Sequence, residues 1–350
     1  LIVREKLTVV GPNCAGIIHL PPGARFAATF LRDMPLGPNR HGMAAFITQS
    51  GALGEEAIAA SKALTVPLGS LVSVGNAVQL GVADYLDYLG EQDSISAVLL
   101  YIESVDDEAR FERVARRIVA RKPVVALIGG RTDAGAAAAR RHTGAAAQSE
   151  TRIEALCRDA CLLRVKSLRQ LLLAAKGFGS FPQGIGKRAL ILSNSGGPGV
   201  LCADEVAVQG LDLPDLPQAM ATTLRANLPA EAAVANPIDL LADAREDRFG
   251  LTLEAAVKHG AGVFDAILGI HVVPFMVDAT PVVARMAALA SSVMMPFLYS
   301  MMGTLPEKTA WFAAMEAAGV PVFNDVEAMA ECAGLLARYP ALKVHAAATA

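Results

Sequence analysis

The chain is poor in the features that mark nucleic-acid-binding, membrane and secreted proteins. Only 5% of its 350 residues are aromatic, and its basic and acidic residues are interspersed along the sequence. Nucleic-acid binding usually leaves a basic stripe with interleaved aromatics, and none occurs. No apolar run approaches the roughly 20 residues of a membrane span, and no signal peptide is recognisable. We therefore expect small molecules or another protein as partners, with no nucleic acid and no membrane.

Cysteines are few and irregularly spaced. The five lie at positions 14, 157, 161, 202 and 332, without a C-x-x-C pair. This spacing favours a reduced, cytoplasmic setting over a disulfide framework. Cys157 and Cys161 are four residues apart on a predicted helix, but two ligands do not make a zinc site. We expect two small buried side chains and no metal.

Small apolar residues dominate what is present. The chain is 53% hydrophobic, mostly Ala, Leu and Val, which suits helices packed closely on sheets. Short apolar runs alternate with amphipathic segments, the pattern of parallel strands joined by crossover helices. In the first half, strands are predicted at 7–13, 43–50, 70–76, 96–104, 123–130 and 162–165, with a Pro- and Gly-rich connector at 21–40 and helices at 150–159 and 167–176.

A Gly-rich linker at 177–187 leads into a second series of the same kind. It includes a predicted strand at 212–213, a loop at 235–244, and helices at 198–208 and 325–338. Both halves open with a strand, a small-residue turn and a helix, written "ITQSGALGEEA" and "LSNSGGPGVLCADE". The sequence therefore predicts two related doubly wound α/β layers.

The two openings are candidate phosphate sites. A helix that starts at small residues exposes unpaired N–H groups and the positive end of its dipole, which favours anions. Ser50 and Gly51 open one helix, and Gly196 and Gly197 open the other. Ser50 and Ser195 could instead be ordinary helix caps. Neither opening is a G-x-x-x-x-G-K-[ST] P-loop, and no complete G-x-G-x-x-G fingerprint occurs.

Glu103 and His142 are candidates for chemistry. Glu103 ends a largely apolar strand, and His142 lies in a small-residue loop after the next strand, in "ARRHTGAAAQSE". The ends of neighbouring parallel strands are close in space, so the carboxylate could hold one ring nitrogen and leave the other as a nucleophile. The alternatives are a solvated acid and an ordinary exposed histidine. Cys14, beside Asn13, has no nearby histidine base, which favours a small buried thiol over covalent catalysis. Asp239 follows a Pro-led turn as a cap or a substrate contact.

A series of motifs in a fixed order identifies a resemblance that covers nearly the whole chain. The motifs are "GPNCAGI", "ITQSGALG", "SVGN", "LLYIES", "GRTDAGAAAARRHTGA", "SNSGGPGVLCAD" and "NPIDLL". The chain resembles the NDP-forming acyl-CoA synthetases, the superfamily of succinyl-CoA synthetase, and within them the ADP-forming acetate–CoA ligases. The resemblance implies two flavodoxin-like domains and an acid–thiol ligase activity.

The resemblance also implies roles for individual residues. His142 matches the histidine that is transiently phosphorylated, and Glu103 the glutamate that supports it. Ser50–Gly51 and Gly196–Gly197 match the helix starts that hold phosphate. Asn13 and Cys14 match the place where CoA and the acyl group react, and Asn76 and Asp239 are assigned to CoA and acyl binding.

The implied reaction converts acyl-CoA, phosphate and ADP to a carboxylic acid, CoA and ATP. Its substrates are phosphate and either acyl-CoA or, in the reverse direction, the carboxylic acid. Its intermediates are an acyl phosphate and phosphorylated His142. The resemblance also implies that CoA binds as a cofactor. It implies that ADP or ATP binds together with Mg on an ATP-grasp domain. The ATP-grasp part is missing from this sequence, so a partner domain or subunit, and a homo- or hetero-oligomer, are expected.

The resemblance divides the chain into four parts. Residues 1–20 match the end of a Rossmann-like CoA-binding domain, so the chain is expected to begin inside a domain, and 21–40 form a connector. Residues 41–180 match a flavodoxin-like ligase domain with the phosphohistidine loop, and 186–340 match a second one. Arg140 and Arg141 depart from the small residues expected before His142.

Two other functions compete with the enzyme. The same architecture occurs fused to a protein lysine acetyltransferase domain, as a regulatory module that senses CoA or nucleotide and often lacks the histidine. A structural partner that only binds CoA is the third possibility. The presence of both His142 and Glu103 favours the enzyme.

Overall fold

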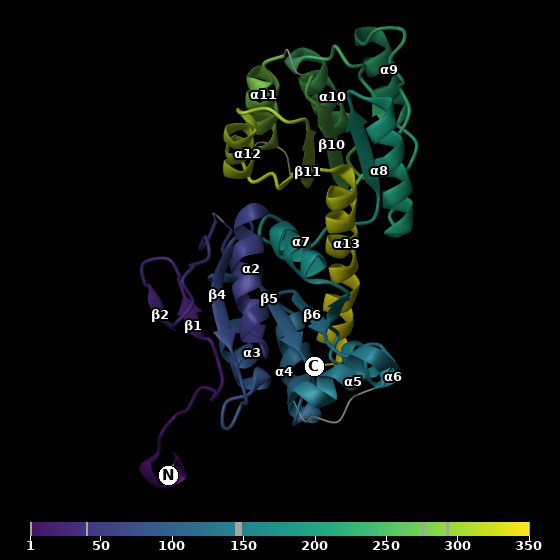
Figure 1. Ribbon diagram of the computed structural model, residues 1–350. Coiled ribbons are helices and arrows are strands. Elements are labelled where there is room, and N and C mark those ends of the chain that lie inside the picture. Colours follow the sequence, from purple (N-terminus) through teal and green to yellow (C-terminus); the bar gives the residue numbers. More distant parts are fainter. Residues whose placement is uncertain (1, 40, 144–148, 275–276, 292–293, 350) are drawn as a thin grey trace. The chain divides into compact units, whose positions relative to one another are not determined.

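The computed structural model describes residues 1–350 except 1, 40, 144–148, 275–276, 292–293 and 350 (Figure 1). For residues 2–3, 139–140 and 142–143 only the backbone is described. The chain forms two units, one made of residues 1–184 with 338–350 and the other of residues 185–337.

The first unit is built on a seven-stranded sheet in the order β2-β1-β4-β3-β5-β6-β7. Strands β3 to β7 are parallel, and β1 pairs antiparallel with both β2 and β4. Counted from β3, the parallel strands run 2-1-3-4-5, the flavodoxin-like doubly wound order. The strands are β1 (Gly16–His19), β2 (Phe26–Thr29), β3 (Met43–Thr48), β4 (Leu68–Ser73), β5 (Ile95–Ile102), β6 (Val124–Ile128) and β7 (Leu163–Val165).

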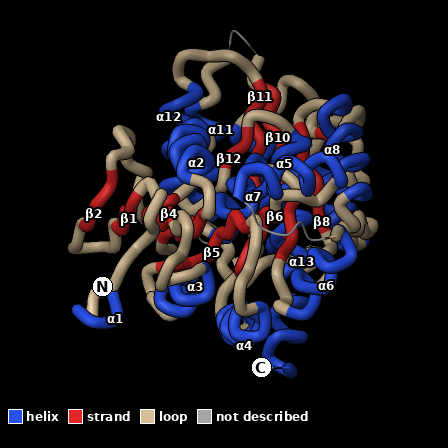
Figure 2. Tube along the Cα trace, turned by 60° about the horizontal axis from the view of Figure 1, so that its bottom comes forward, coloured by secondary structure: helices blue, strands red, loops and turns tan. Residues whose placement is uncertain are grey.

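Helices cover both faces of this sheet. Helices α2 and α7 pack together over β3 to β6, whereas α3 and α4 pack together on the other side (Figure 2). Every residue of β3 and β4 is buried, as expected for parallel strands that are covered on both faces. The helices are α2 (Gly51–Ala63), α3 (Val82–Gly90), α4 (Glu108–Val119) and α7 (Leu168–Phe178), with a short α1 (Ile2–Glu5) at the N-terminus.

The predicted strand at 7–13 is wrong. Gly11 has φ +89° and Asn13 has φ +55°, and these left-handed conformations turn the chain where a strand would need it extended. The first strand is β1, and β2 lies inside the predicted connector. Residues 1–40 thus add two antiparallel strands to the edge of the first sheet. Their origin in a CoA-binding domain remains a prediction.

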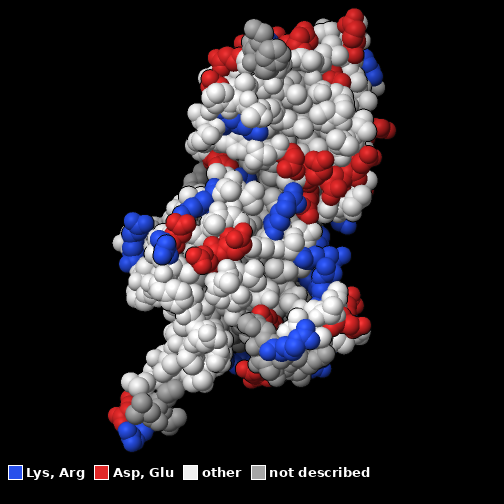
Figure 3. Space-filling view, in the orientation of Figure 1, with Lys and Arg blue, Asp and Glu red and all other residues white. Residues whose placement is uncertain are grey.

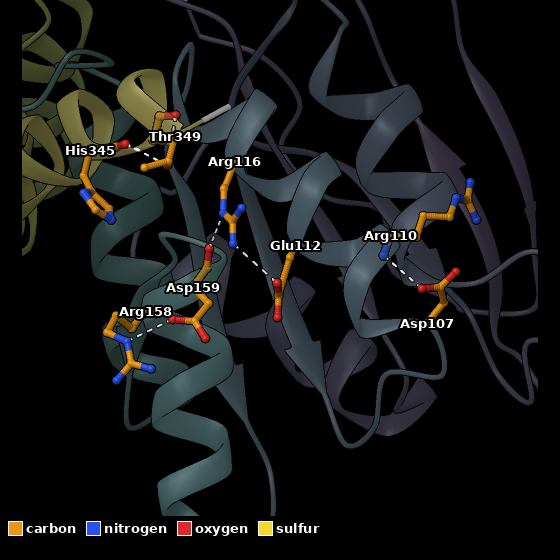
Figure 4. Close-up of polar contacts among 9 residues, drawn as sticks. Asp107, Arg110, Glu112, Arg116, Arg158, Asp159, His345 and Thr349 are labelled. Atoms are coloured by element: carbon orange, nitrogen blue, oxygen red, sulfur yellow. Dashed lines mark hydrogen bonds and ion pairs between the residues drawn. The ribbon is translucent and has the colours of Figure 1, made fainter.

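His142 lies in a helix rather than in the predicted loop. Helix α5 (Asp133–Thr143) continues through it, because its run of alanines has the highest helix propensity of any residue. Helix α6 (Glu150–Asp159) follows and is tied to α4 by side chains. Arg116 donates to the carbonyl of Asp159 and pairs with Glu112 (Figure 4). The chain beyond the His142 segment is therefore anchored to the body of the first unit.

The second unit repeats the architecture of the first. Its five-stranded sheet is parallel in the order β12-β11-β10-β8-β9, which is again 2-1-3-4-5 counted from β8. The predicted fold class of two flavodoxin-like doubly wound sheets is thereby confirmed. The strands are β8 (Ala189–Ser193), β9 (Ile238–Asp239), β10 (Ala266–Val272), β11 (Phe297–Met302) and β12 (Val322–Phe323).

The helices of the second unit are α8 (Gly196–Val208), α9 (Gln218–Asn227), α10 (Glu246–His259), α11 (Thr280–Ala290), α12 (Lys308–Ala317) and the first part of α13 (Val326–Thr349). Helix α13 is longer than the predicted 325–338. Its last residues belong to the first unit, where the hydroxyl of Tyr339 donates to the carbonyl of Val119 at 3.0 Å and its ring packs on Phe178.

The predicted strand at 212–213 is wrong, and β9 lies in the predicted loop. Asp212 forms only an isolated bridge with Arg188. The side chain of Asn236 takes the place of a strand there, since it donates to the carbonyls of Ala189 and Pro214 at 2.9 Å and accepts from the N–H of Ile191 at 3.0 Å. The chain after Pro237 then pairs with β8.

A buried histidine makes the second unit sensitive to acid. His271 on β10 is 2% exposed, and its Nδ1 lies 2.9 Å from the hydroxyl of Tyr299. Burial lowers the pKa of His271 from 6.5 to about 4. The unfolded chain therefore binds the proton more readily than the folded chain. The stability that comes from keeping His271 neutral is complete above about pH 6.5, and it is lost as the pH falls toward 4.

We expect the free energy of unfolding of the second unit to fall by about 1.4 kcal/mol per pH unit over this window, or ~3 kcal/mol in all. Urea titrations of wild type and His271→Phe between pH 7 and 4 measure it. The variant should lose this slope, and the exposed His345→Ala should keep it. Equal slopes in His271→Phe and wild type would contradict the assignment.

No helix in the described part of the chain is both long and apolar enough to cross a membrane. Over the same residues, no group of three or more His, Cys, Asp and Glu could hold a metal ion. On the face shown in Figure 3, positive and negative side chains are interspersed among large uncharged areas.

Candidate functional site

The site of the first unit lies where β3 and β5 end side by side, the point at which the strand order reverses. Ligands of doubly wound sheets bind at such switch points. The side chain of Gln49, just after β3, bridges to the residues after β5. Its Oε1 accepts from the N–H of Glu103 at 2.5 Å and of Ser104 at 3.1 Å, and its Nε2 donates to the carbonyl of Ser104 at 2.9 Å. Gln49 thus fixes Glu103 beside the start of α2.

The carboxylate of Glu103 has a partner on its own strand. The hydroxyl of Tyr101 donates to Oε1 of Glu103 at 3.0 Å. Both side chains are half-buried, and Glu103 is a partly enclosed, oriented acid. The sequence did not single out Gln49 or Tyr101. The alternation of strand side chains could have found Tyr101, because residues i and i+2 share a face.

Helix α2 begins at Gly51 with Ser50 as its N-cap. The hydroxyl of Ser50 accepts from the N–H of Leu53 at 3.3 Å, and a capping residue of this kind stabilises a helix by ~1 kcal/mol. Thr48 braces the turn, since its hydroxyl accepts from the N–H of Ser50 at 3.0 Å and donates to the carbonyl of Ser50 at 2.8 Å. Ser50 is therefore a cap, and the first N–H groups of α2 remain for an anion.

Helix α8 opens the same way with one difference. The hydroxyl of Ser193 braces the backbone of Ser195 as Thr48 braces Ser50. The third residue of α8, however, is Pro198, which has no N–H to donate. Among the described residues, Ser195 accordingly makes no side-chain capping hydrogen bond. Its hydroxyl and the N–H groups of Gly196 and Gly197 are available to an anion.

Asp239 lies at the start of α8. Its Oδ1 accepts from the N–H of Leu241 at 2.9 Å, and its Oδ2 would lie 3.1 Å from a Cβ placed on Gly196. A Cβ on Gly197 would meet nothing within 4 Å. Asp239 belongs to the second unit, together with Gly196 and Gly197. The other three residues assigned to CoA and acyl binding belong to the first unit. The predicted contact of Asp239 with CoA or the acyl group remains a prediction.

Asn13, Cys14 and Asn76 come together where β4 ends beside the start of β1. Nδ2 of Asn13 donates to Oδ1 of Asn76 at 3.3 Å, and the N–H of Asn76 donates to the carbonyl of Pro12 at 2.9 Å. Cys14 is a free thiol that is partly exposed, so the buried thiol favoured by the sequence is wrong. The same turn contacts the start of α2, the candidate phosphate site. Ala15 lies against Gly51, and a Cβ placed on Gly51 would be 3.3 Å from the Cβ of Ala15.

Gly75 holds these two turns in contact. It has φ +63°, and a Cβ placed on it would lie 2.2 Å from the carbonyl oxygen of Pro12. Two costs therefore oppose any side chain there, the left-handed backbone and the collision with a backbone atom. Gly23 in the same unit has φ +81° but nothing within 4 Å of its Cβ position.

We expect Gly75→Ala to lower the free energy of unfolding by about 3 kcal/mol, and Gly23→Ala by only ~1 kcal/mol, which is the backbone cost alone. Urea titration of the two variants measures the difference. Similar losses in both would show that the contact between Gly75 and Pro12 contributes nothing.

One buried hydroxyl beside this turn has no partner among the described residues. Tyr85 on α3 is 8% exposed, and its hydroxyl makes no hydrogen bond there. Burial raises the pKa of Tyr85, and the nearby Cys14 and Asp84 raise it further. A small cavity of about 160 Å³ lies close by, lined by Gln49, Gln79, Asp84, Ser104 and Arg110 among others. Asp84 and Arg110 are paired across it at 2.6 Å.

The side chain of His142 lies outside the described residues, as do the residues after Thr143 up to 148. The structure places the backbone of His142 in the last turn of α5, after β6, whose residues pair with β5. Its contact with Glu103 remains a prediction. Arg141 is exposed, and the side chain of Arg140 is also outside the described residues.

The other cysteines are structural. Cys157, Cys161 and Cys202 form no disulfide and are buried, and Cys332 is buried as well. Burial raises the pKa of Cys157 to about 11 and that of Cys202 to about 12. The thiols of Cys157 and Cys202 therefore stay protonated and unreactive near neutral pH.

Two family models match the two units described above. The model described as "Succinyl-CoA ligase like flavodoxin domain" matches residues 41–178, and the one described as "Ligase-CoA domain" matches residues 189–324. The chain belongs to the NDP-forming acyl-CoA synthetase family. The resemblance drawn from the motifs is thereby confirmed.

Several members of this family are similar along most of the chain. The acetate–CoA ligase [ADP-forming] II subunit alpha of Pyrococcus furiosus is 35% identical over 278 residues, which is 79% of this chain and 59% of that protein. The acetate–CoA ligase [ADP-forming] I of Archaeoglobus fulgidus is 36% identical over 257 residues, 72% of this chain and 36% of that protein. The chain therefore spans about a third to three fifths of these relatives.

A solved structure of the same architecture covers both units. The dinucleotide forming acetyl-coenzyme A synthetase 1 of Ca. Korarchaeum cryptofilum, in complex with phosphate and ADP, has a TM-score of 0.88 and 27% sequence identity. The match includes 99% of this chain and 74% of that one. The similar proteins described here are ligases and synthetases, which gives no support to the regulatory acetyltransferase module.

Proposed function

We propose that the chain is the phosphohistidine-carrying portion of an ADP-forming acyl-CoA synthetase. The observation that carries the proposal is the arrangement at the switch point of the first unit, where Gln49 joins the anion-ready start of α2 to the oriented carboxylate of Glu103. The matching start of α8, with its uncapped Ser195 and open Gly197, supports a phosphate-binding helix start in the second unit as well.

The reaction proceeds in three transfers. A phosphate oxygen attacks the acyl carbonyl of the thioester, the C–S bond breaks, and CoA leaves as an acyl phosphate forms. A ring nitrogen of His142 then attacks phosphorus, an N–P bond forms, and the carboxylate leaves with the electron pair of the broken P–O bond. Finally an oxygen of ADP takes the phosphoryl group and restores the neutral histidine.

Glu103 has a defined part in the second transfer. A neutral imidazole that donates its N–H to a carboxylate presents the other nitrogen as a nucleophile. As the N–P bond forms, the ring gains positive charge, and the carboxylate stabilises it. Each helix start contributes about 0.3–1 kcal/mol to phosphate binding, and up to ~2 kcal/mol when partly buried. The backbone N–H groups and the Ser195 hydroxyl add directed hydrogen bonds to this modest attraction.

The remaining components are part of the same proposal. CoA binds near Asn13, Cys14 and Asn76, with Asp239 as a further contact. ADP/ATP with Mg binds on an ATP-grasp domain or subunit, with which the chain forms a homo- or hetero-oligomer in the cytoplasm. The relatives support acetate as the first acid to test, since two of them are named for it.

Radiolabelled acetyl phosphate tests the proposal without CoA or nucleotide. Incubated with it, the 350-residue chain should take up close to one phosphoryl group, in a form that acid releases and alkali does not, as expected of a phosphohistidine. Acetate should be released in equal amount. Failure to form any acid-labile label, when the protein is folded by circular dichroism, would sink the proposal.

A further inference from the structure

Tyr101 and Glu103 form a pair at the end of β5 that no sequence motif assigns a joint role. They lie two positions apart, so both side chains leave the same face of the strand. The hydroxyl of Tyr101 donates to Oε1 of Glu103 at 3.0 Å. Tyr101 itself is fixed in the sheet, where it pairs with Thr48 on β3 and Leu127 on β6.

The backbone of Glu103 is already held before Tyr101 acts. Oε1 of Gln49 accepts the N–H of Glu103 at 2.5 Å, and Nε2 of Gln49 holds the carbonyl of Ser104 at 2.9 Å. The freedom that remains to Glu103 is rotation about its side-chain bonds. The bond to Tyr101 restricts this rotation, and it occupies one carboxylate oxygen while leaving the other to a second donor.

The surroundings keep this bond in place. Burial raises the pKa of Tyr101, and the charge of Glu103 raises it further, so the phenol remains a protonated donor at neutral pH. Gly129 at the end of β6 leaves room for the pair. A Cβ placed on Gly129 would lie 3.0 Å from the hydroxyl oxygen of Tyr101 and 3.6 Å from Cγ of Glu103.

We propose that Tyr101 is a positioning residue, which holds one carboxylate oxygen of Glu103 so that the other accepts the imidazole N–H of His142 during phosphoryl transfer. The inference rests on the proposed function, because it assigns Tyr101 a part in forming the phosphohistidine. Tyr101 acts only through Glu103 and does not itself contact the phosphoryl group.

Phosphorylation of the chain by radiolabelled acetyl phosphate provides the test. Tyr101→Phe should lower the rate constant at saturation about 10-fold, as expected for the loss of one hydrogen bond to a charged group. The KM for acetyl phosphate should not change, because Tyr101 contacts no substrate. Tyr88→Phe removes the hydroxyl of a tyrosine that is 62% exposed and should behave as wild type.

A double-mutant cycle separates positioning from a general structural effect. In a Glu103→Ala background there is no carboxylate to hold, so adding Tyr101→Phe should change the rate less than 2-fold. Gly129→Ala, whose methyl group enters the space of the Tyr101 hydroxyl, should lower the wild-type rate in the same direction.

Two results would overturn the inference while leaving the proposed function intact. One is a Tyr101→Phe variant that is labelled as fast as wild type. The other is an equal slowing by Tyr101→Phe with and without Glu103. A wild-type chain that takes no label would instead refute the proposed function, and this inference with it.

Discussion

Replacing His142 by alanine is expected to lower labelling by acetyl phosphate at least about 1,000-fold, to the background of the assay. The loss should be this large because the ring of His142 itself forms the proposed N–P bond. The helix starts that are proposed to bind phosphate are unchanged, so the KM or the Kd for inorganic phosphate should stay within about 3-fold of wild type. Quench-flow labelling followed by acid and alkali treatment measures both the rate and the chemical nature of the label.

His345 provides the matched control. It is an exposed histidine on α13, far along the sequence from the switch point of the first sheet. His345→Ala should be labelled as wild type. Equal acid-labile labelling of His142→Ala and wild type would show that phosphate is carried elsewhere, and the proposed function would then be wrong.

The central strands of both units could be predicted because they depend on patterns that extend over several residues. Buried parallel strands need continuous apolar runs, and "MAAFIT" and "ALILS" are such runs with every residue buried. The short edge strands could not be found in this way. β9 has two residues, and its place is set by the side chain of Asn236, which occupies the edge of β8 first. A local pattern does not show such a competitor.

The candidate site was only partly visible in the sequence for a similar reason. Glu103 and Ser50 stand at strand and helix ends, which periodicity locates well. The side chains that orient them do not share that signal. Gln49 acts across 54 residues of sequence, and its amide looks like any other polar residue in a turn. The difference between Ser50 and Ser195 follows from Pro198, and it could have been predicted from the missing N–H alone.

The helix through His142 has a consequence for the phosphoryl transfer. Alanine favours a helix in α5, but a helix of this composition buries little and is held by few contacts. Among its described side chains, only Ala136 is buried. The chain on the far side is fixed by Arg116 and by the pair between Arg152 and Glu108 at 2.6 Å. Under the proposed function, the sparse packing of the described part of α5 suits a histidine that reaches both an acyl phosphate and a nucleotide.

Glu103→Gln is expected to slow labelling by acetyl phosphate about 100-fold. The amide keeps the size of the side chain and can still accept from Tyr101, but it cannot stabilise the positive charge that the imidazole gains as the N–P bond forms. Because the loss occurs in the transition state, the rate constant should fall while the KM stays within about 3-fold. Glu231→Gln, at an exposed position of the second unit, is the control and should leave the rate unchanged. If Glu103→Gln is labelled at the wild-type rate, the carboxylate supplies no charge stabilisation, and His142 must be activated by another group.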